Sequence, residues 1–244
     1  MLIRSRYKVT HVQSAKKNYA ALLAVDIEGR DKREYLLNVY EGELVKQYVG
    51  CFDQLRHCPE YRGMFMDQGS LVAVFDSVEG EPIDQVFYRG AAVDWKQRVS
   101  FADQLFHLGL CISDFPPEIS CAALLSENLR IKTLEGRIVL RYQIEPLEGM
   151  NQREAALLLV DQARKILLRR FNSPDAEIVF LESLEEQVFL SPVELYRHWL
   201  QHRQAITDGY QALDAKVSLQ RWLYLLFRNL VRGIRRLRKG KRRR

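Results

Sequence analysis

The sequence lacks any run of about 18 uncharged apolar residues, the length that a membrane-spanning helix needs. Its N-terminal stretch MLIRSRYKVTHV also lacks the long apolar core of a secretory signal peptide. We therefore expect no membrane-spanning segment and no export signal. The expected location is the cytoplasm.

Cysteine is scarce, and its spacing fits neither a disulfide framework nor a zinc site. Three of the four cysteines lie in or beside apolar runs, so buried reduced thiols are expected. The four are Cys51, Cys58, Cys111 and Cys121. His198 and His202 stand four residues apart in HWLQH, a spacing that lets two imidazoles face one metal ion. No third ligand is evident, so we predict no metal site and no cofactor.

Acidic residues are absent from residues 221–244, which hold 11 Lys or Arg. The preceding part of the chain holds 26 basic and 31 acidic residues, although the whole chain has a net charge of +6. The body is thus acidic and the tail strongly basic. Such an asymmetry is typical of a segment that attaches to anionic partners.

The tail also has the pattern of an amphipathic helix, with apolar side chains about four residues apart and arginines on the other side. An aromatic and aliphatic face opposed by arginine is typical of a helix that lies on anionic lipid. Docking of the apolar face on the protein itself and contact with nucleic acid are the alternatives. The predicted membrane-binding residues are Trp222, Leu226, Phe227, Leu230, Arg228, Arg232, Arg235 and Arg236.

The first third of the chain is rich in short β-type runs. RYKVTHV, YAALLAVDI and REYLLNVYE predict three antiparallel strands, and GELVKQYVGCFDQLRHC predicts a helix because its apolar residues recur every three or four positions. YRGMFMDQGS and LVAVFDSVEG predict two more strands. The expected order is three strands, one helix and two strands.

From about residue 83 the pattern becomes helical. Three long helices are predicted in DWKQRVSFADQLFHLGLCISDF, NQREAALLLVDQARKILLRRF and SPVELYRHWLQHRQAITDGYQALDA. The second is apolar over most of its circumference and should be central, and Ser191 should cap the third. We predict an α+β protein with a β-rich small lobe (1–82), a helical large lobe (83–214) and a basic amphipathic tail (215–244).

This order of elements resembles the protein kinase fold across roughly residues 6–205. VAVFDSVEGEPIDQVF is similar to the segment that joins the two lobes in that family, and Asn128 stands where the family has its catalytic-loop Asn. The resemblance implies a cleft between the lobes. It also allows the residues of phosphoryl transfer to be checked one at a time.

The resemblance places unsuitable residues at the other catalytic positions. Asn38 stands at the phosphate-gripping Lys, Ala123 at the catalytic Asp and Arg141 at the metal-binding Asp. The first hairpin, VQSAKKNYAAL, contains no Gly, which disfavours close approach of the backbone to a phosphate. We therefore predict a protein that is not an enzyme, in which Asn128 satisfies backbone groups of its own loop.

The expected function is that of a pseudokinase: an inactive scaffold or regulatory module that binds a protein partner and is held at the inner face of the membrane by its tail. The chain is distantly similar in this respect to the bacterial type VII secretion pseudokinases, in which a basic stretch follows the pseudokinase domain. It departs from them because no spanning helix follows. An atypical nucleotide-binding kinase and a nucleic-acid-binding protein are the alternatives.

Overall fold

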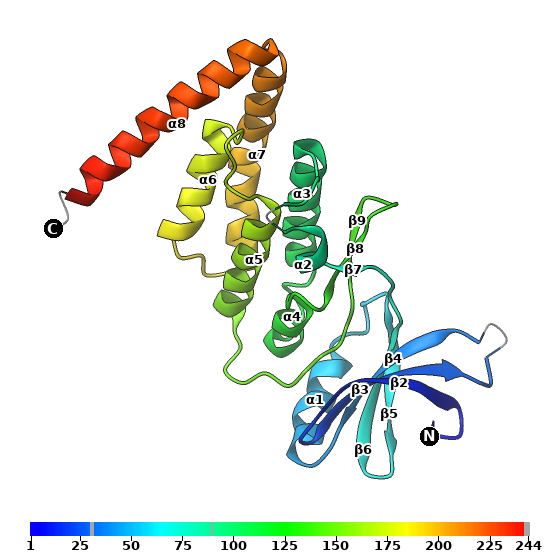
Figure 1. Cartoon of the computed structure of the whole chain (residues 1–244). Helices are drawn as coiled ribbons and strands as arrows, with labels where there is room; N and C mark the ends of the chain where they lie inside the picture. The colour runs from blue at the N-terminus through cyan, green and yellow to red at the C-terminus, as the bar shows by residue number, and fades with distance from the viewer. Residues whose placement is uncertain (30–31, 89, 242–244) are drawn as a thin grey trace.

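The computed structural model describes residues 1–29, 32–88 and 90–241, with side chains up to Arg232. The chain forms two lobes and a projecting C-terminal helix (Figure 1). One lobe is built around an antiparallel sheet and the other around helices, so the prediction of an α+β two-lobed fold is confirmed. The N-terminus lies on the sheet lobe, and the C-terminal helix projects from the far side of the molecule.

The small lobe is a six-stranded antiparallel sheet with the order β1-β2-β3-β4-β6-β5. The connection between β2 and β3 has only two residues, and Asn18 takes a positive φ of 61° there, a conformation that Asn tolerates better than most residues. The strands are β1 (Leu2–Ile3), β2 (Tyr7–Lys16), β3 (Tyr19–Asp26), β4 (Glu34–Tyr40), β5 (Tyr61–Asp67) and β6 (Ser70–Asp76).

The single helix of the small lobe, α1 (Glu43–Asp53), packs under this sheet. It buries Tyr48 and Phe52, two of the apolar residues whose spacing predicted the helix. Tyr48 stacks on Tyr40 of β4 with ring centroids 4.4 Å apart, and Phe52 contacts the ring of Phe75. The helix thereby fixes the face of the sheet that is turned toward the large lobe.

The two faces of the sheet have different cores because side chains alternate along each strand. In β4, Leu36 belongs to the large core that continues into the helical lobe. Its neighbour Leu37 belongs to a smaller cluster on the opposite face, together with Ile3 and Tyr7. The lobes therefore share one continuous hydrophobic core.

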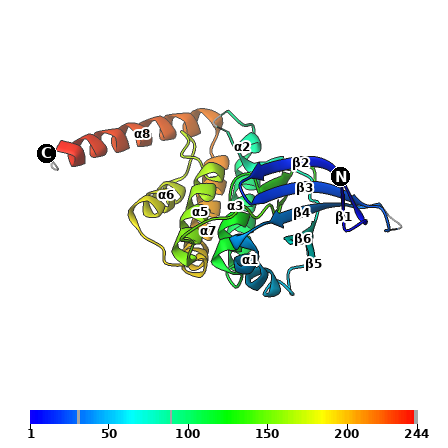
Figure 2. The same cartoon turned by 90° about the horizontal axis from the view of Figure 1, so that it is seen from below.

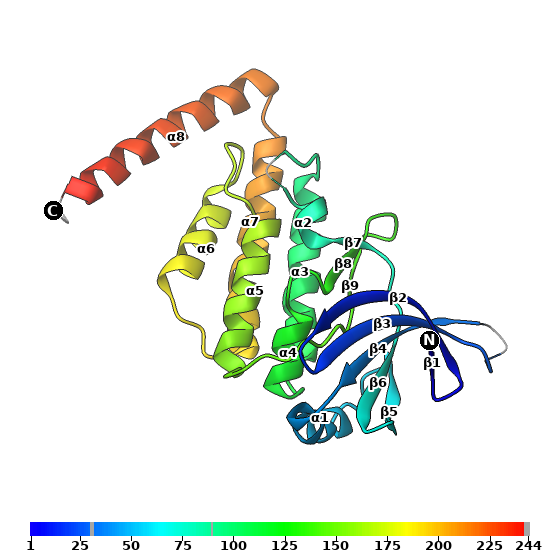
Figure 3. The same cartoon turned by 60° about the horizontal axis from the view of Figure 1, so that its bottom comes forward.

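The large lobe is organised around α3 (Trp95–Cys111), α5 (Gln152–Ile166) and α7 (Pro192–Asp214), which lie side by side (Figure 3). Gly109 allows α3 and α5 to approach closely, since a Cβ atom there would lie 2.3 Å from Leu159. The central position predicted for α5 is confirmed by its contacts with α3, α4 and α7. Ser191 caps α7 as predicted, accepting a hydrogen bond from the amide of Glu194.

Shorter elements complete the large lobe. A second sheet, with the order β7-β8-β9, lies beside the connection between the lobes. The sequence analysis did not predict α6, which packs along α7. These elements are β7 (Glu81–Pro82), α2 (Ile83–Val86), α4 (Pro117–Ala123), β8 (Leu129–Lys132), β9 (Arg137–Leu140) and α6 (Asp175–Glu186).

The last helix, α8 (Ser218–Lys241), leaves the end of α7 and extends away from the small lobe, as the view from below in Figure 2 also shows. A helix was predicted here from the amphipathic pattern. Within the described residues, no helix combines the length and the apolar character needed to cross a bilayer.

Candidate functional site

The kinase-like site lies between the two lobes, and Asn38 in the middle of β4 is its central polar residue. Its side chain is fully buried. Its Oδ1 accepts hydrogen bonds from the Tyr19 hydroxyl at 2.9 Å and the Ile144 amide at 2.8 Å, and its Nδ2 donates to the Tyr142 carbonyl at 2.9 Å. The amide thus connects the small lobe to the segment after β9 without any charge.

Aromatic side chains surround Asn38. Tyr40 donates a 2.6 Å hydrogen bond to the Ile144 carbonyl, and the ring of Tyr142 stacks on Phe75 at 5.1 Å and 11°. Burial raises the pKa of Tyr19, of Tyr40 and of Tyr142 above the ordinary tyrosine value, so these phenols stay neutral. The space around Asn38 is therefore a packed, uncharged core.

The hairpin between β2 and β3 also contacts the segment after β9. Ser14 donates a 2.9 Å hydrogen bond to the Glu145 carboxylate, and Lys16 forms an ion pair with the same group. The hairpin contains no Gly, as its sequence showed. These two contacts hold it against the large lobe.

Ala123 and Asn128 flank the end of α4, and both are fully buried. Nδ2 of Asn128 donates to the carbonyls of Ala122 at 2.7 Å and Gln143 at 2.9 Å, and its Oδ1 accepts from the Gln143 amide at 3.3 Å. The side chain thus satisfies one backbone group beside its own loop, the Ala122 carbonyl, while its other two hydrogen bonds go to Gln143 in the segment after β9. It also fixes the segment that carries Arg141.

Arg141 follows β9 and is half-buried. Its backbone amide donates to the Asn128 carbonyl at 2.8 Å. Burial, and then the nearby cation of Arg130, lower the pKa of the Arg141 guanidinium. A metal ion at this position would add a further positive charge to two guanidinium groups, which is electrostatically unfavourable.

Asn38, Ala123, Asn128 and Arg141 lie near the junction of the two lobes, and their assignment to kinase positions stays a prediction. Asn38 and Asn128 hold successive parts of the segment from Tyr142 to Ile144. The sequence analysis missed the tyrosines that complete this arrangement. No local signal identifies them, because Asn38 and Tyr142 are 104 positions apart.

The histidine pair lies between α6 and α7. Nε2 of His198 is 2.7 Å from the Ser183 hydroxyl, and the rings of His198 and His202 are 4.5 Å apart. Among the residues that the structure describes, no three His, Cys, Asp or Glu side chains are grouped so that they could hold a metal ion.

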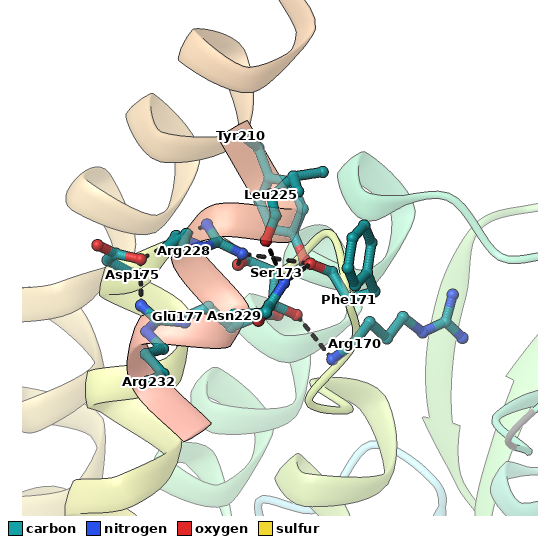
Figure 4. Close-up of polar contacts among 10 residues, drawn as sticks. All are labelled: Arg170, Phe171, Ser173, Asp175, Glu177, Tyr210, Leu225, Arg228, Asn229 and Arg232. Atoms are coloured by element: carbon teal, nitrogen blue, oxygen red, sulfur yellow. Dashed lines mark hydrogen bonds and ion pairs between the residues drawn. The ribbon is translucent and has the colours of Figure 1, made fainter. Parts of the chain in front are cut away.

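One face of α8 docks on the large lobe (Figure 4). Leu225 is buried, and Nη2 of Arg228 donates to the carbonyls of Ser173 at 2.7 Å and Phe171 at 3.2 Å. Asn229 donates to the Phe171 carbonyl at 3.0 Å, and Arg232 forms an ion pair with Asp175. The segment between α5 and α6 is therefore the surface on which α8 docks.

The structure gives Arg228 a different role from the predicted one. Its side chain is only 9% exposed, because it inserts between α8 and the loop that precedes α6. Arg228 is therefore an anchor of the helix on the protein and is not free to contact lipid. The side chains of Arg235 and Arg236, two further predicted membrane contacts, lie outside the described residues.

The opposite face of α8 carries large apolar side chains that the protein leaves exposed. The predicted membrane residues have exposed fractions of 52% for Trp222, 43% for Leu226, 71% for Phe227 and 58% for Leu230. Leu219 and Leu223 extend the same face. Since residues three and four apart share one side of a helix, these side chains form a continuous apolar stripe.

Comparison with known proteins identifies the fold. No protein-family model and no curated protein matches the chain. The apo GRMZM2G135359 pseudokinase is similar to it with a TM-score of 0.54 and 10% identity, over 80% of this chain and 92% of that one. Rad53 in complex with AMP-PNP gives 0.51 and 14%, over 78% of this chain and 62% of that one.

A double mutant of the PknI kinase domain from Mycobacterium tuberculosis is also similar, with a TM-score of 0.53 and 12% identity, over 86% of this chain and 97% of that domain. These structures include a pseudokinase and kinases, so they bear on the fold and not on activity. The link to type VII secretion pseudokinases stays a prediction. At these low identities the likeness shows the architecture alone: the chain has the two-lobed protein kinase-like fold.

Proposed function

We propose that the protein is a catalytically inactive kinase-like module that binds a protein partner and is held at an anionic membrane surface by α8. The observation that carries the first part is Asn38, which stands at the phosphate-gripping position and is buried in three hydrogen bonds to the protein's own groups. An uncharged, fully buried amide whose oxygen and nitrogen both bond to the protein cannot supply the positive charge that grips a phosphate.

The other groups of the site support inactivity for separate reasons. Phosphoryl transfer depends on positioning and charge: acids hold magnesium, and one carboxylate accepts the proton of the attacking hydroxyl. Ala123 can do neither, and Arg141 has the wrong sign of charge. Several independent losses at one site are hard to reconcile with an atypical kinase that keeps the ordinary metal-dependent chemistry.

The exposed stripe of α8 supports the membrane part. Trp222, Leu226, Phe227 and Leu230 can insert between lipid headgroups without any change in how Arg228 docks the helix. Arg228 and Arg232 are engaged by the protein, so apolar insertion contributes more than charge over this part of α8. The cations of residues 233–244, known from the sequence, add attraction to anionic lipid.

Thermal unfolding with ATP tests inactivity. The full chain is heated with and without ATP, in the presence and absence of magnesium, and we expect no metal-dependent rise in the unfolding temperature. A clear rise that requires magnesium would favour the atypical nucleotide-binding kinase over the inactive module. An active protein kinase of similar size serves as the positive control.

Vesicle co-sedimentation tests membrane binding. The full chain should sediment with vesicles that contain anionic lipid and should bind neutral vesicles more weakly, and high salt should reduce the binding only in part, since apolar insertion is not screened. If the full chain stays in the supernatant under every condition, the proposed membrane binding is wrong. Tight binding to DNA or RNA with a steep salt dependence, measured in parallel, would favour the nucleic-acid alternative.

A further inference from the structure

A large cavity lies beside the connection between the lobes. Its volume is about 1080 Å³. We call it the hinge groove and define it by Ser77 and Glu79 of the connection, Leu108 and Ile112 of α3, and Leu140 and Tyr142 around the end of β9. Asn38, Asn128 and Arg141 do not line it, so the groove lies beside the polar centre of the kinase-like site, and Tyr142 belongs to both.

The floor of the hinge groove is apolar and is formed by residues of the packed core. Ile112, Leu140 and Tyr142 belong to the continuous core of the two lobes, and Leu108 and Phe115 pack against that core. This volume is slightly above the range of small-molecule sites, which is about 300–1,000 Å³. A groove of this size with a fixed apolar floor suits a segment of polypeptide.

The rim of the hinge groove offers negative charge. Glu79 and Asp114 are exposed, and neither makes a hydrogen bond or an ion pair with any residue that the structure describes. The groove is also lined by the basic residues Arg33, Lys132 and Arg137, of which Lys132 and Arg137 share Glu135 as their partner. Because five acidic side chains line the groove against these three basic ones, the charge that it presents to an incoming segment is acidic on balance.

We propose that the hinge groove is the docking site for the protein partner, and that the partner contributes a segment with Lys or Arg beside apolar side chains. Its apolar side chains cover Leu108, Ile112 and Phe115, and its cations pair with Glu79 and Asp114. The choice of partner rests on charge complementarity, which steers association and disfavours acidic competitors. This inference rests on the proposed function of the protein as a binding module.

Cys111 provides a direct reporter of occupancy. It lies in the wall of the hinge groove and is exposed, whereas Cys58 and Cys121 are buried and Cys51, on α1, is half-buried and does not line the groove. A bound segment should slow the alkylation of Cys111. The alkylation of Cys51 in the same sample, followed by mass spectrometry, serves as the internal control.

The experiment selects binders from a displayed library of random short peptides on the immobilised full chain. Selected peptides should be rich in Lys or Arg beside apolar residues, and they should slow the alkylation of Cys111. Glu79→Lys with Asp114→Lys should weaken them roughly tenfold or more, because the reversal replaces attraction by repulsion at both positions. The matched control, Glu148→Lys with Glu186→Lys, makes the same change of net charge on exposed acids outside the groove.

Several outcomes would overturn the inference: no enrichment, enrichment of acidic peptides, unchanged alkylation of Cys111, or equal weakening by both double variants. Thermal unfolding of both variants confirms that they are folded. The proposed function fails by different results, namely a magnesium-dependent ATP shift or an absence of vesicle binding. Neither of those results depends on Glu79 or Asp114.

Discussion

The interlobe site and α8 differ in the exposure of their side chains: the polar side chains between the lobes are buried, whereas large apolar side chains along α8 are exposed. Between the lobes, Asn38 and Asn128 are buried and every polar atom of their side chains is hydrogen-bonded to the protein. Along α8, Trp222 and Phe227 are exposed although they are among the most costly side chains to leave in water. A site whose polar groups are all used internally has little left for a ligand, whereas an uncovered apolar stripe still lacks its partner.

Because of this contrast, we expect the protein to act by binding through its exposed surface and not through the cleft between the lobes. The cleft that gives a kinase its activity here contributes to stability, because it joins the lobes through Asn38, Tyr40 and the segment up to Glu145. The tail is held in place by buried Arg228 and presents its other side outward. A change confined to one of these regions should leave the other unaffected.

The largest expected effect is on vesicle binding. Trp222→Glu with Phe227→Glu removes two inserting side chains, each contributing about 2 kcal/mol, so binding to anionic vesicles should weaken by roughly 1000-fold. Co-sedimentation measures the change. The free energy of unfolding should stay unchanged, because both side chains are exposed in the folded protein.

The matched control for this change is Val188→Glu with Leu200→Glu, which alters two exposed apolar residues of the large lobe outside α8. It should leave vesicle binding intact. Equal loss in the two double variants would mean that general surface charge governs the binding. In that case the stripe on α8 would have no special role.

The next effect concerns stability. Asn38→Leu keeps the size of the side chain but leaves the Tyr142 carbonyl and the Ile144 amide without their partner, and the free energy of unfolding should fall by about 3 kcal/mol. Denaturant unfolding measures this, with exposed Gln47→Leu as the control. Vesicle binding should not change, and a stability equal to that of the control would show that Asn38 does not join the lobes.

Much of the fold could be predicted from the sequence, because the strands and most helices carry their own local patterns. The periodicity in α1, α3, α5 and α7 reflects the burial of one face of each helix. The helix α6 was missed although it buries Ile178, Phe180 and Leu181, residues in the short mixed run AEIVFLESLEE. The pattern of such a run is compatible with a strand or a helix, and its helical structure depends on packing against α7.

The candidate site was less predictable for a different reason. The sequence could assign Asn38, Ala123 and Arg141 to kinase positions by resemblance, and it predicted that these side chains lack the groups that phosphoryl transfer uses. It could not show that Asn38 contacts Tyr142, or that Arg228 reaches the carbonyl of Ser173, 55 positions away. Contacts of this range depend on how the lobes and helices pack, and no local pattern encodes them.

A smaller effect tests the docking of α8. Arg228→Met keeps the apolar stem but removes the hydrogen bonds to Ser173 and Phe171, and the docked state of α8 should lose about 2 kcal/mol. Amide hydrogen exchange within α8 should accelerate roughly 30-fold at most, while α3 should remain protected. Exposed Arg197→Met is the control. Unchanged exchange in α8 would show that Arg228 does not anchor the helix.

The smallest predicted effect is on the pH dependence of stability, and it separates the interlobe site from the seam between α6 and α7. Burial, and then the neighbouring His202, lower the pKa of His198, while Glu194 opposes the change. The folded protein therefore favours neutral His198. Its contribution to stability is fully present above the unfolded pKa of about 6.5 and is lost as the pH falls through the folded value.

Acidification from neutral pH toward pH 5 should thus lower the free energy of unfolding by less than about 1 kcal/mol through His198. Replacement of this residue in His198→Gln, which can still reach the Ser183 hydroxyl, should remove that part of the slope. Asn38→Leu should lower stability by the same amount at every pH in this range, because the phenols around Asn38 stay neutral. Denaturant unfolding at several pH values measures both variants. A pH slope that changes with Asn38→Leu but not with His198→Gln would place the titrating group between the lobes and would contradict the uncharged core described there.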